Sequence, residues 1–175
     1  RGSGVFVTQT PTDYPIGRRV RFHQNLTAAG RTPAKTILTL ETRLADTKEA
    51  DALKLTNLPT DVHVYEGLSL ADDTPIAVFR SVFPAARFPG LLNDLDDTRS
   101  VTQALLRHGI ADYTRASTRL TAKMANATQA LHLRISEGAP ILRTVGINID
   151  ESGTPIEFGH TWFAGERVTL TVDDL

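Results

Sequence analysis

The stretch that decides the fold is Val145-Gly-Ile-Asn-Ile-Asp150, followed by Glu151-Ser-Gly-Thr-Pro155 and Ile156-Glu-Phe-Gly-His-Thr-Trp-Phe163. Apolar residues alternate with glycine or polar residues from 145 to 150, which is typical of a half-buried strand. Ser, Gly and Pro between 151 and 155 indicate a turn. The alternation resumes after the turn, so the stretch predicts two consecutive strands.

The second of these strands has two unlike faces, because successive side chains of a strand point to opposite sides. One face is bulky enough to pack a core and consists of Ile156, Phe158, His160 and Trp162. The other face combines a lone carboxylate, a gap, a hydroxyl and an aromatic ring, in the residues Glu157, Gly159, Thr161 and Phe163. This second composition fits a sheet surface that faces a ligand, and a solvated face with one phenylalanine is the alternative.

Composition limits the classes of protein that the chain can belong to. With 175 residues, 41% of them hydrophobic, it can bury one sizeable core, and one domain is expected. The net charge of −1 argues against nucleic-acid binding by bulk electrostatics. The absence of cysteine and of a long apolar run fits a cytoplasmic protein without a membrane segment. Because the chain starts at Arg1 rather than Met, we expect a fragment of a longer protein.

The remaining sequence predicts an α+β fold, a mainly antiparallel sheet with helices on one side. Capping boxes predict three helices, at Asp46 with Glu49, Ser100 with Gln103, and Asn126 with Gln129. Further strands are expected at 35–44, 62–70, 76–83 and 114–124. In the last of these, the residues expected to face the core are Ala116, Leu120 and Ala122, while Arg115 and Arg119 face out or towards an opening. Residues 8–15 contain two prolines and are interpreted as a linker.

The sequence contains no catalytic signature of the common hydrolase, metalloprotease or nucleotide-binding types. Its five histidines show no spacing that places a metal-binding pair on one helix or strand. His160 shares a strand face with Ile156, Phe158 and Trp162, so we expect a hydrogen-bonded core histidine rather than a catalytic one.

Anion binding has better support. The helix that begins after Ser100 offers unpaired amides and a hydroxyl, although Ser100 can equally serve only as the cap of its own helix. The one dense basic cluster is Arg18-Arg-Val-Arg21, and a solvated face is the alternative interpretation of such a run.

Several short motifs then occur in a specific order along the chain. They are Gly4-Val-Phe-Val7, Asp13-Tyr-Pro15, Arg21-Phe22 with Gln24-Asn-Leu26, the helix from Ser100 to Gly109-Ile110, Thr118-Arg119, and Pro155-Ile-Glu157. With these motifs, over essentially all 175 residues, the chain resembles the effector-binding (UTRA) domain of HutC-subfamily regulators in the GntR superfamily. Within the subfamily it most resembles the repressors of phosphonate-uptake and degradation operons.

The resemblance implies a fold like that of chorismate lyase, in which a mostly antiparallel sheet with flanking helices encloses a pocket. It implies that residues 1–12 are the remnant of a winged-helix wing strand plus a linker, and that residues 13–175 are the ligand-binding and dimerisation domain. The implied protein is a transcriptional regulator rather than an enzyme. Its expected partners are a second copy of itself, a small anionic effector such as a phosphonate or phosphate ester, and operator DNA bound by a winged-helix domain missing from this chain. No cofactor or metal is expected.

The resemblance also implies a set of ligand-binding residues. Ser100 is expected at a phosphate-like group, and Glu157 with Phe163 at the far end of the ligand. The full expected set is Arg18, Arg19, Arg21, Phe22, Ser81, Ser100, Glu157 and Phe163.

The chain departs from its resemblance at four positions. Similar domains often carry two arginines in place of Gly67 and Ser69, a glutamate in place of Phe79, and a tyrosine in place of Phe163. The pocket is therefore expected to be less cationic and more apolar than that of sugar-phosphate sensors. Two alternative functions are a chorismate lyase-like enzyme, which the missing arginines disfavour, and a dimerisation module with a vestigial pocket.

Overall fold

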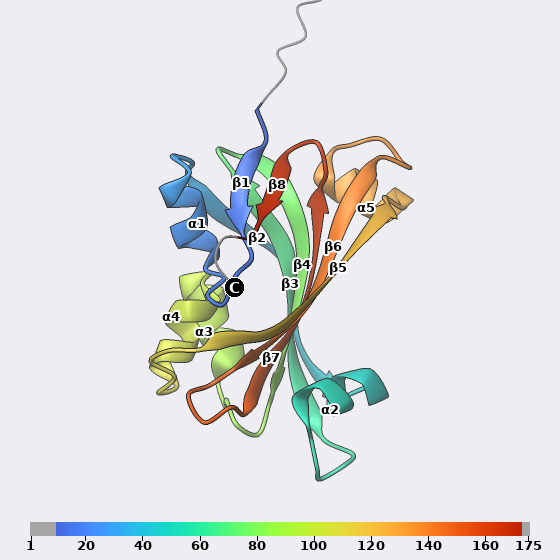
Figure 1. Ribbon diagram of the computed structural model, residues 1–175. Helices are drawn as coiled ribbons and strands as arrows, with labels where there is room; N and C mark the ends of the chain where they lie inside the picture. The colour runs from blue at the N-terminus through green and yellow to red at the C-terminus, as the bar shows by residue number, and fades with distance from the viewer. Residues whose placement is uncertain (1–9, 173–175) are drawn as a thin grey trace, which may run out of the picture.

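A six-stranded antiparallel sheet with the order β2-β3-β4-β7-β6-β5 forms the centre of the molecule (Figure 1). The structure is a computed structural model and describes residues 10–172. The strands are β2 (Pro33–Leu44), β3 (Asp61–Ala71), β4 (Thr74–Pro84), β5 (Thr114–Met124), β6 (Pro140–Ile149) and β7 (Pro155–Ala164). The predicted α+β class with a mainly antiparallel sheet is confirmed, and each predicted strand within the sheet is present.

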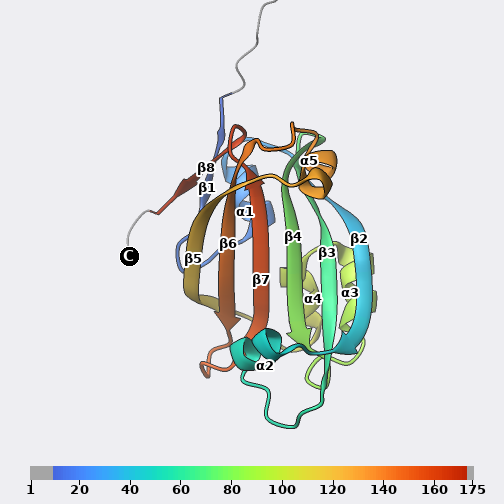
Figure 2. The ribbon, with the colours of Figure 1, turned by 90° about the vertical axis from the view of Figure 1, so that its right-hand side faces the viewer.

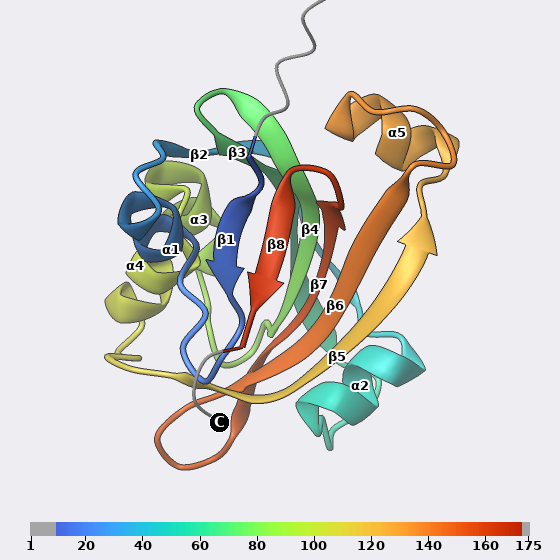
Figure 3. The same cartoon turned by 45° about the horizontal axis from the view of Figure 1, so that its top comes forward.

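A second, two-stranded sheet lies beside the large one (Figure 3). Its strands, β1 (Thr12–Pro15) and β8 (Val168–Thr171), run parallel. The interpretation of 8–15 as a linker is therefore wrong for residues 12–15. Tyr14 is buried there, and its ring packs against Phe163 at a centroid distance of 5.2 Å. The strand expected near residues 1–7 lies outside the described residues.

Helices cover both faces of the large sheet, as Figure 2 shows. Three of them lie on the side that we call the inner face: α1 (Phe22–Ala28), α3 (Leu91–Thr98) and α4 (Val101–Arg107). The other two pack on the outer face: α2 (Thr47–Leu53) and α5 (Ala127–Leu133). The expectation of helices on one side is wrong, because Leu53 and Leu133 bury themselves against apolar side chains at the two ends of the outer face.

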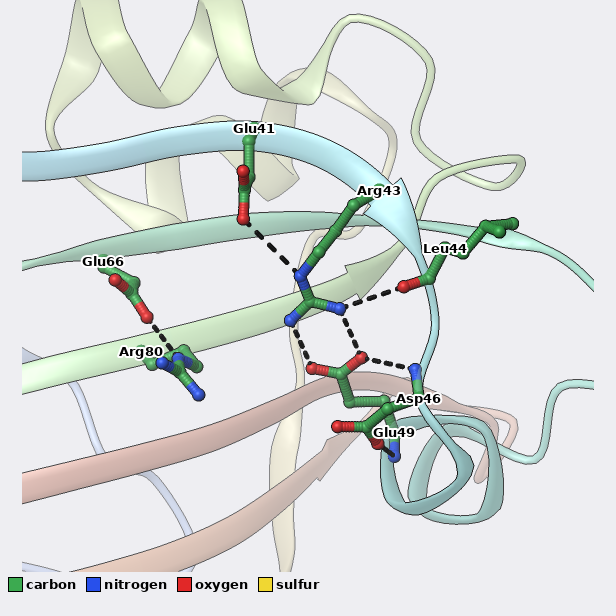
Figure 4. A network of polar contacts seen from close by, with 7 residues as sticks. All are labelled: Glu41, Arg43, Leu44, Asp46, Glu49, Glu66 and Arg80. Atoms are coloured by element: carbon green, nitrogen blue, oxygen red, sulfur yellow. Dashed lines mark hydrogen bonds and ion pairs between the residues drawn. The ribbon is translucent and has the colours of Figure 1, made fainter.

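Local capping explains which helices the sequence predicts and which it does not. The reciprocal capping boxes of α2 and α5 are both present, and each helix ends at a left-handed residue, Lys54 or Arg134. At α4, Ser100 accepts a hydrogen bond from the Gln103 amide, but the return bond is not formed. Helices α1 and α3 have no side-chain cap, so no capping signal predicts them. The capping network of α2 continues into an ion pair with strand β2 (Figure 4).

The main core lies between the inner face and α3 and α4, around Tyr65, Phe83 and Phe88. On β7 the predicted assignment of faces needs correction. Phe158, His160 and Trp162 lie half-buried on the outer face, where the imidazole stacks on the Trp162 ring at 5.7 Å. Ile156 departs from their alternation because the β6–β7 register shifts next to it, and it packs into the main core instead.

His160 is not the fully hydrogen-bonded histidine that we expect from the sequence. Its Nδ1 is buried and has no hydrogen-bond partner among the described residues. Burial lowers the pKa of the imidazole.

Strand β5 is an exposed edge, and the expectation that Ala116, Leu120 and Ala122 face the core is wrong, because all three are exposed. The expectation for its arginines is confirmed. Arg119 is exposed, and Arg115 faces a cavity next to a register shift between Arg115 and Ser117.

No helix within residues 10–172 is long and apolar enough to cross a membrane. In the same part of the chain, no three His, Asp or Glu side chains gather as a metal site would require.

Candidate ligand-binding site

A cavity of about 460 Å³ lies on the inner face, enclosed by the sheet, β1 and the starts of α1 and α4. The sheet contributes Lys35, Ser69, Phe79, Ser81, Arg115, Asn148, Glu157, Thr161 and Phe163. The facing wall consists of Tyr14, residues 20–24, Thr98, residues 100–103 and Tyr113. A cavity of this volume, with polar groups converging on it, suits a small molecule.

Glu157 forms the polar centre of the sheet wall. Its side chain is buried, and its Oε1 accepts a hydrogen bond of 2.6 Å from Ser81 Oγ. Its Oε2 accepts a hydrogen bond of 2.6 Å from Asn148 Nδ2, and the side-chain oxygen Oδ1 of Asn148 accepts one of 2.7 Å from Arg115 Nε. No cationic side chain of the described chain forms an ion pair with Glu157. The carboxylate is thus held in place by neutral donors and keeps acceptor capacity for a ligand.

Arg21 lies in the facing wall, and one of its guanidinium nitrogens already donates hydrogen bonds to protein groups. Its Nη2 donates 3.1 Å to Asp112 Oδ1 and 2.6 Å to the Tyr113 carbonyl. Its guanidinium carbon lies 3.6 Å from the centroid of the Tyr113 ring. Asp112 also pairs with Arg19, and hydrogen bonding from Arg19 lowers the pKa of that carboxyl. The charge of Arg21 is therefore partly neutralised before any ligand arrives.

Lys35 lines the cavity from the beginning of strand β2. Its ammonium nitrogen lies 4.3 Å from the centroid of the Phe79 ring, 5.1 Å from that of Phe22 and 5.6 Å from that of Tyr65. Burial lowers the pKa of Lys35 to about 8, and the negative charge of Glu157 opposes this shift in part. The ammonium forms no hydrogen bond or ion pair within residues 10–172.

The start of α4 contributes hydroxyl and amide groups to the wall. Ser100 Oγ accepts a hydrogen bond of 3.3 Å from the Gln103 amide, and the Ser100 amide donates 3.2 Å to Thr98 Oγ1. Ser100 is therefore a cap and a cavity residue together, and its hydroxyl proton remains available to a ligand oxygen. The helix has seven residues, so its dipole is short.

The structure brings six of the eight residues expected from the sequence into one cavity: Arg21, Phe22, Ser81, Ser100, Glu157 and Phe163. Arg18 and Arg19 are exposed and do not line it. Their positions have a local cause, because the Arg18 carbonyl accepts a hydrogen bond from the Arg115 amide and the Arg19 side chain pairs with Asp112. For these two residues the alternative of a solvated face describes the structure better.

The set expected from the sequence lacks several polar lining residues, among them Lys35, Tyr113, Arg115 and Asn148. Asn148 had a usable signal, because it alternates with the apolar residues of β6 and so shares a face with the residue paired to it, Glu157. Lys35 had none, since an isolated lysine near a strand start is usually solvated.

Gly67 and Ser69 explain why the cavity carries few arginines. A Cβ on Gly67 would come within 2.3 Å of the Thr36 carbonyl oxygen and 2.8 Å of the Phe79 ring, so no side chain fits there. Ser69 is buried in the lining and pairs with Lys35 across the β2–β3 ladder. The strand that lacks arginine thus lies directly beside a lysine.

Comparison with known proteins identifies the family. The family model described as the UTRA domain matches residues 28–169. The chain belongs to the UTRA domain family. An uncharacterised HTH-type transcriptional regulator of Rhizobium meliloti is 32% identical over 99% of this chain and 71% of its own length. The transcriptional regulator PhnF of Escherichia coli is 28% identical over 99% of this chain and 71% of its own.

Solved structures agree with the family at the level of the fold. The crystal structure of the effector domain of PhnF from Mycobacterium smegmatis superposes with a TM-score of 0.81 at 19% identity, over 93% of this chain and 99% of that one. The resemblance drawn from the sequence motifs is confirmed, and the relatives of this UTRA domain are transcriptional regulators.

Proposed function

We propose that this UTRA domain is the effector-binding and dimerisation part of a DNA-binding repressor, and that its cavity binds a small anionic metabolite such as a phosphonate or phosphate ester. The observation that carries the proposal is that the cavity wall contains charges of both signs. Lys35 and Arg21 present positive charge, while Glu157 presents a buried carboxylate with no ion-pair partner among the described residues. A ligand with an anionic group at one end and hydrogen-bond donors at the other complements this wall.

The proposed positions within the cavity follow from the same contacts. Ser100 and the cationic side chains face the anionic group, and Glu157, held by Ser81, accepts hydrogen bonds from the opposite end of the ligand. Phe22 and Phe163 supply apolar wall around the middle. A helix of seven residues contributes little charge of its own, so side chains provide most of the attraction.

Regulation requires that the ligand distinguish two states of the protein. We propose that the whole regulator is a two-fold symmetric dimer whose winged-helix domains contact two operator half-sites. An effector changes operator affinity only to the extent that it binds one arrangement of the dimer more tightly than the other. The α1 and α4 starts, which form the wall opposite the sheet, are the elements that a ligand can draw together.

A thermal-shift screen tests the proposal. The set contains alkylphosphonates, phosphate esters, sugar phosphates and dicarboxylates, each with a neutral analogue of the same size as its matched control. A ligand at 100 times its Kd stabilises the folded state by about 2.7 kcal/mol, which gives a readable shift in Tm. We expect stabilisation by at least one phosphoryl compound and none by its neutral analogue. No shift with any anion in the set would contradict the proposed function.

Two variants test whether the ligand binds in this cavity. Arg21→Ala and Glu157→Gln each remove one charged contact from opposite walls of the cavity. If both variants fold and keep the affinity of the parent chain, the ligand binds elsewhere.

A further inference from the structure

We propose that Lys35 is the principal cationic contact for the anionic group of the effector. This inference rests on the proposed function, because it assumes that the cavity binds a small anion. It assigns the anion to a lysine on β2, rather than to the arginines that the sequence points to.

Among the cavity residues, Lys35 is the cation that has no polar partner within residues 10–172. Three positively charged side chains line the cavity within the described residues: Arg21, Lys35 and Arg115. Arg21 donates to Asp112 and to the Tyr113 carbonyl, and Arg115 donates to Asn148 and to Thr118 Oγ1. The Lys35 ammonium donates to no group in this part of the chain, so its three N–H donors are open to a ligand.

The Lys35 ammonium lies among aromatic rings. The ring centroids of Phe22, Tyr65 and Phe79 lie 4.3 to 5.6 Å from its nitrogen. The faces of these rings stabilise a cation but accept no conventional hydrogen bond from it. Unpaired charge next to apolar surface is unfavourable, and a bound oxyanion relieves it. The aromatic walls also restrict the lysine side chain, so less conformational entropy remains to be lost when an anion binds.

The titratable groups around Lys35 lie on several elements. Glu157 lies on β7 and attracts the ammonium without pairing with it. On the facing wall, His23 lies near Lys35, and burial together with the charge of Lys35 lowers the pKa of that imidazole, so it is uncharged at neutral pH. On β3, burial raises the pKa of Tyr65 to about 12, so its phenol is uncharged as well. Of Lys35, His23 and Tyr65, Lys35 is therefore the group that attracts an anion, while the negative charge of Glu157 repels it.

The pH dependence of binding follows from these groups. Lys35 has a lowered pKa of about 8 in the free protein, and a bound anion favours the charged form and so raises that pKa. Anion affinity should thus be greatest below pH 8 and should fall as the pH rises from the free pKa to the bound one. The other charged side chains that line the cavity are Arg21, Arg115 and Glu157. The lowered pKa of His23 and the raised pKa of Tyr65 keep both of these groups neutral over this window.

Sulfate titration of this chain tests the inference, because sulfate is a tetrahedral dianion whose own charge does not change between about pH 6.5 and about pH 9.5. Lys35→Met keeps the length of the side chain and removes its charge. The matched control is Lys123→Met, at an exposed lysine on the edge strand β5. We expect Lys35→Met to weaken sulfate binding roughly 10- to 150-fold at about pH 6.5. Lys123→Met should keep the parent affinity within about twofold.

The second readout is the pH profile, which a merely structural role would not change. Sulfate affinity of the parent chain should fall roughly tenfold or more by about pH 9.5, whereas the weak binding by Lys35→Met should stay level. NMR of ¹³C-labelled lysine can follow the four lysines of the chain separately. One of them should titrate near pH 8 without sulfate and at higher pH with it, and this signal should be missing from Lys35→Met.

Folding is checked on the same samples. Removal of an unpaired cation from an aromatic pocket should leave the Tm of the sulfate-free protein unchanged or higher. Equal sulfate affinity in the parent chain and in Lys35→Met would overturn the inference, and so would a parent chain that does not bind sulfate saturably. The proposed function fails separately, when no anion of the thermal-shift screen binds the parent chain.

Discussion

Two buried glutamates of this domain differ in what surrounds them. Glu49, in the α2 region of the outer face, accepts hydrogen bonds of 2.7 Å from Nη1 and Nη2 of Arg43 and one of 2.9 Å from the Asp46 amide (Figure 4). Glu157, in the cavity of the inner face, receives only the neutral donors Ser81 and Asn148. Both side chains are buried, so burial alone does not separate them.

The difference separates a carboxylate that stabilises the fold from one that is available to a ligand. Arg43 of the protein itself neutralises the charge of Glu49, and this ion pair connects the start of α2 to strand β2. At Glu157 the protein fixes the orientation of the carboxylate but leaves its charge uncompensated, and Lys35 at the same cavity is likewise left unpaired. A site prepared for a ligand of mixed polarity has this property, because the ligand supplies the missing partners.

The largest expected effect is on ligand affinity at Glu157. Glu157→Gln should weaken binding of the effector found by screening roughly 10- to 150-fold, because a charge-assisted contact is lost. Its free energy of unfolding should change by about 1 kcal/mol or less, since Ser81 and Asn148 still have an amide as partner. Isothermal titration and urea unfolding of one preparation measure both quantities. A large loss of stability with unchanged affinity would reverse the roles that we assign.

Glu49→Gln should have the opposite profile. The free energy of unfolding should fall by about 2 kcal/mol, less than for a fully buried pair because about a third of the Arg43 side chain is exposed. Effector affinity should stay within about twofold. The matched control is Glu41→Gln, since Glu41 is half exposed and lies 3.5 Å from the same guanidinium. If Glu41→Gln lowered the free energy of unfolding as much as Glu49→Gln, the Arg43–Glu49 ion pair would have no special role.

The pH dependence of stability sharpens the same comparison. Hydrogen bonds from Arg43 lower the pKa of Glu49 below its ordinary value of 4.5. A lowered folded-state pKa means that the stabilisation is complete above the unfolded pKa and is lost as the pH falls through the folded one. The stability difference between the parent chain and Glu49→Gln should therefore be constant near neutral pH and should shrink below about pH 4.5. Urea midpoints measured from neutral pH into this acid range give the curve, and a difference independent of pH would contradict it.

The smallest effect is expected at the basic cluster. Arg19→Ala should change effector affinity by about twofold at most and leave the stability essentially unchanged, because Arg19 is exposed and its pair with Asp112 is accessible to water. The same titration and unfolding experiments apply. A loss of tenfold or more would place Arg19 at the ligand and restore the prediction made from the sequence.

Alternation and capping carry most of what the sequence can predict here. Glu157 and Phe163 fall on one face by period two, and the structure places both in the cavity. Asp46 and Asn126 mark helix starts through side chains that bond to amides three residues away, which is a local interaction.

What the sequence could not predict depends on non-local packing. Ile156 changes face because of a register shift between strands, and α1 begins without a side-chain cap. Lys35 becomes a cavity residue only when Phe22, Tyr65 and Phe79 close around it from α1, β3 and β4. A cluster of charge in the sequence was a poor guide, since Asp112, more than 90 residues away, pairs with Arg19 and with Arg21.

The central claim is that an anionic effector binds in the cavity of the inner face. Amide NMR of the ¹⁵N-labelled chain, titrated with the metabolite that gives the largest thermal shift, tests this claim most directly. We expect saturable shifts of the amide signals of Phe22, Lys35, Ser100 and Glu157, with those of the α2 region around Glu49 unchanged. Saturable shifts confined to the outer face, with the signals of the cavity residues unmoved, would contradict it.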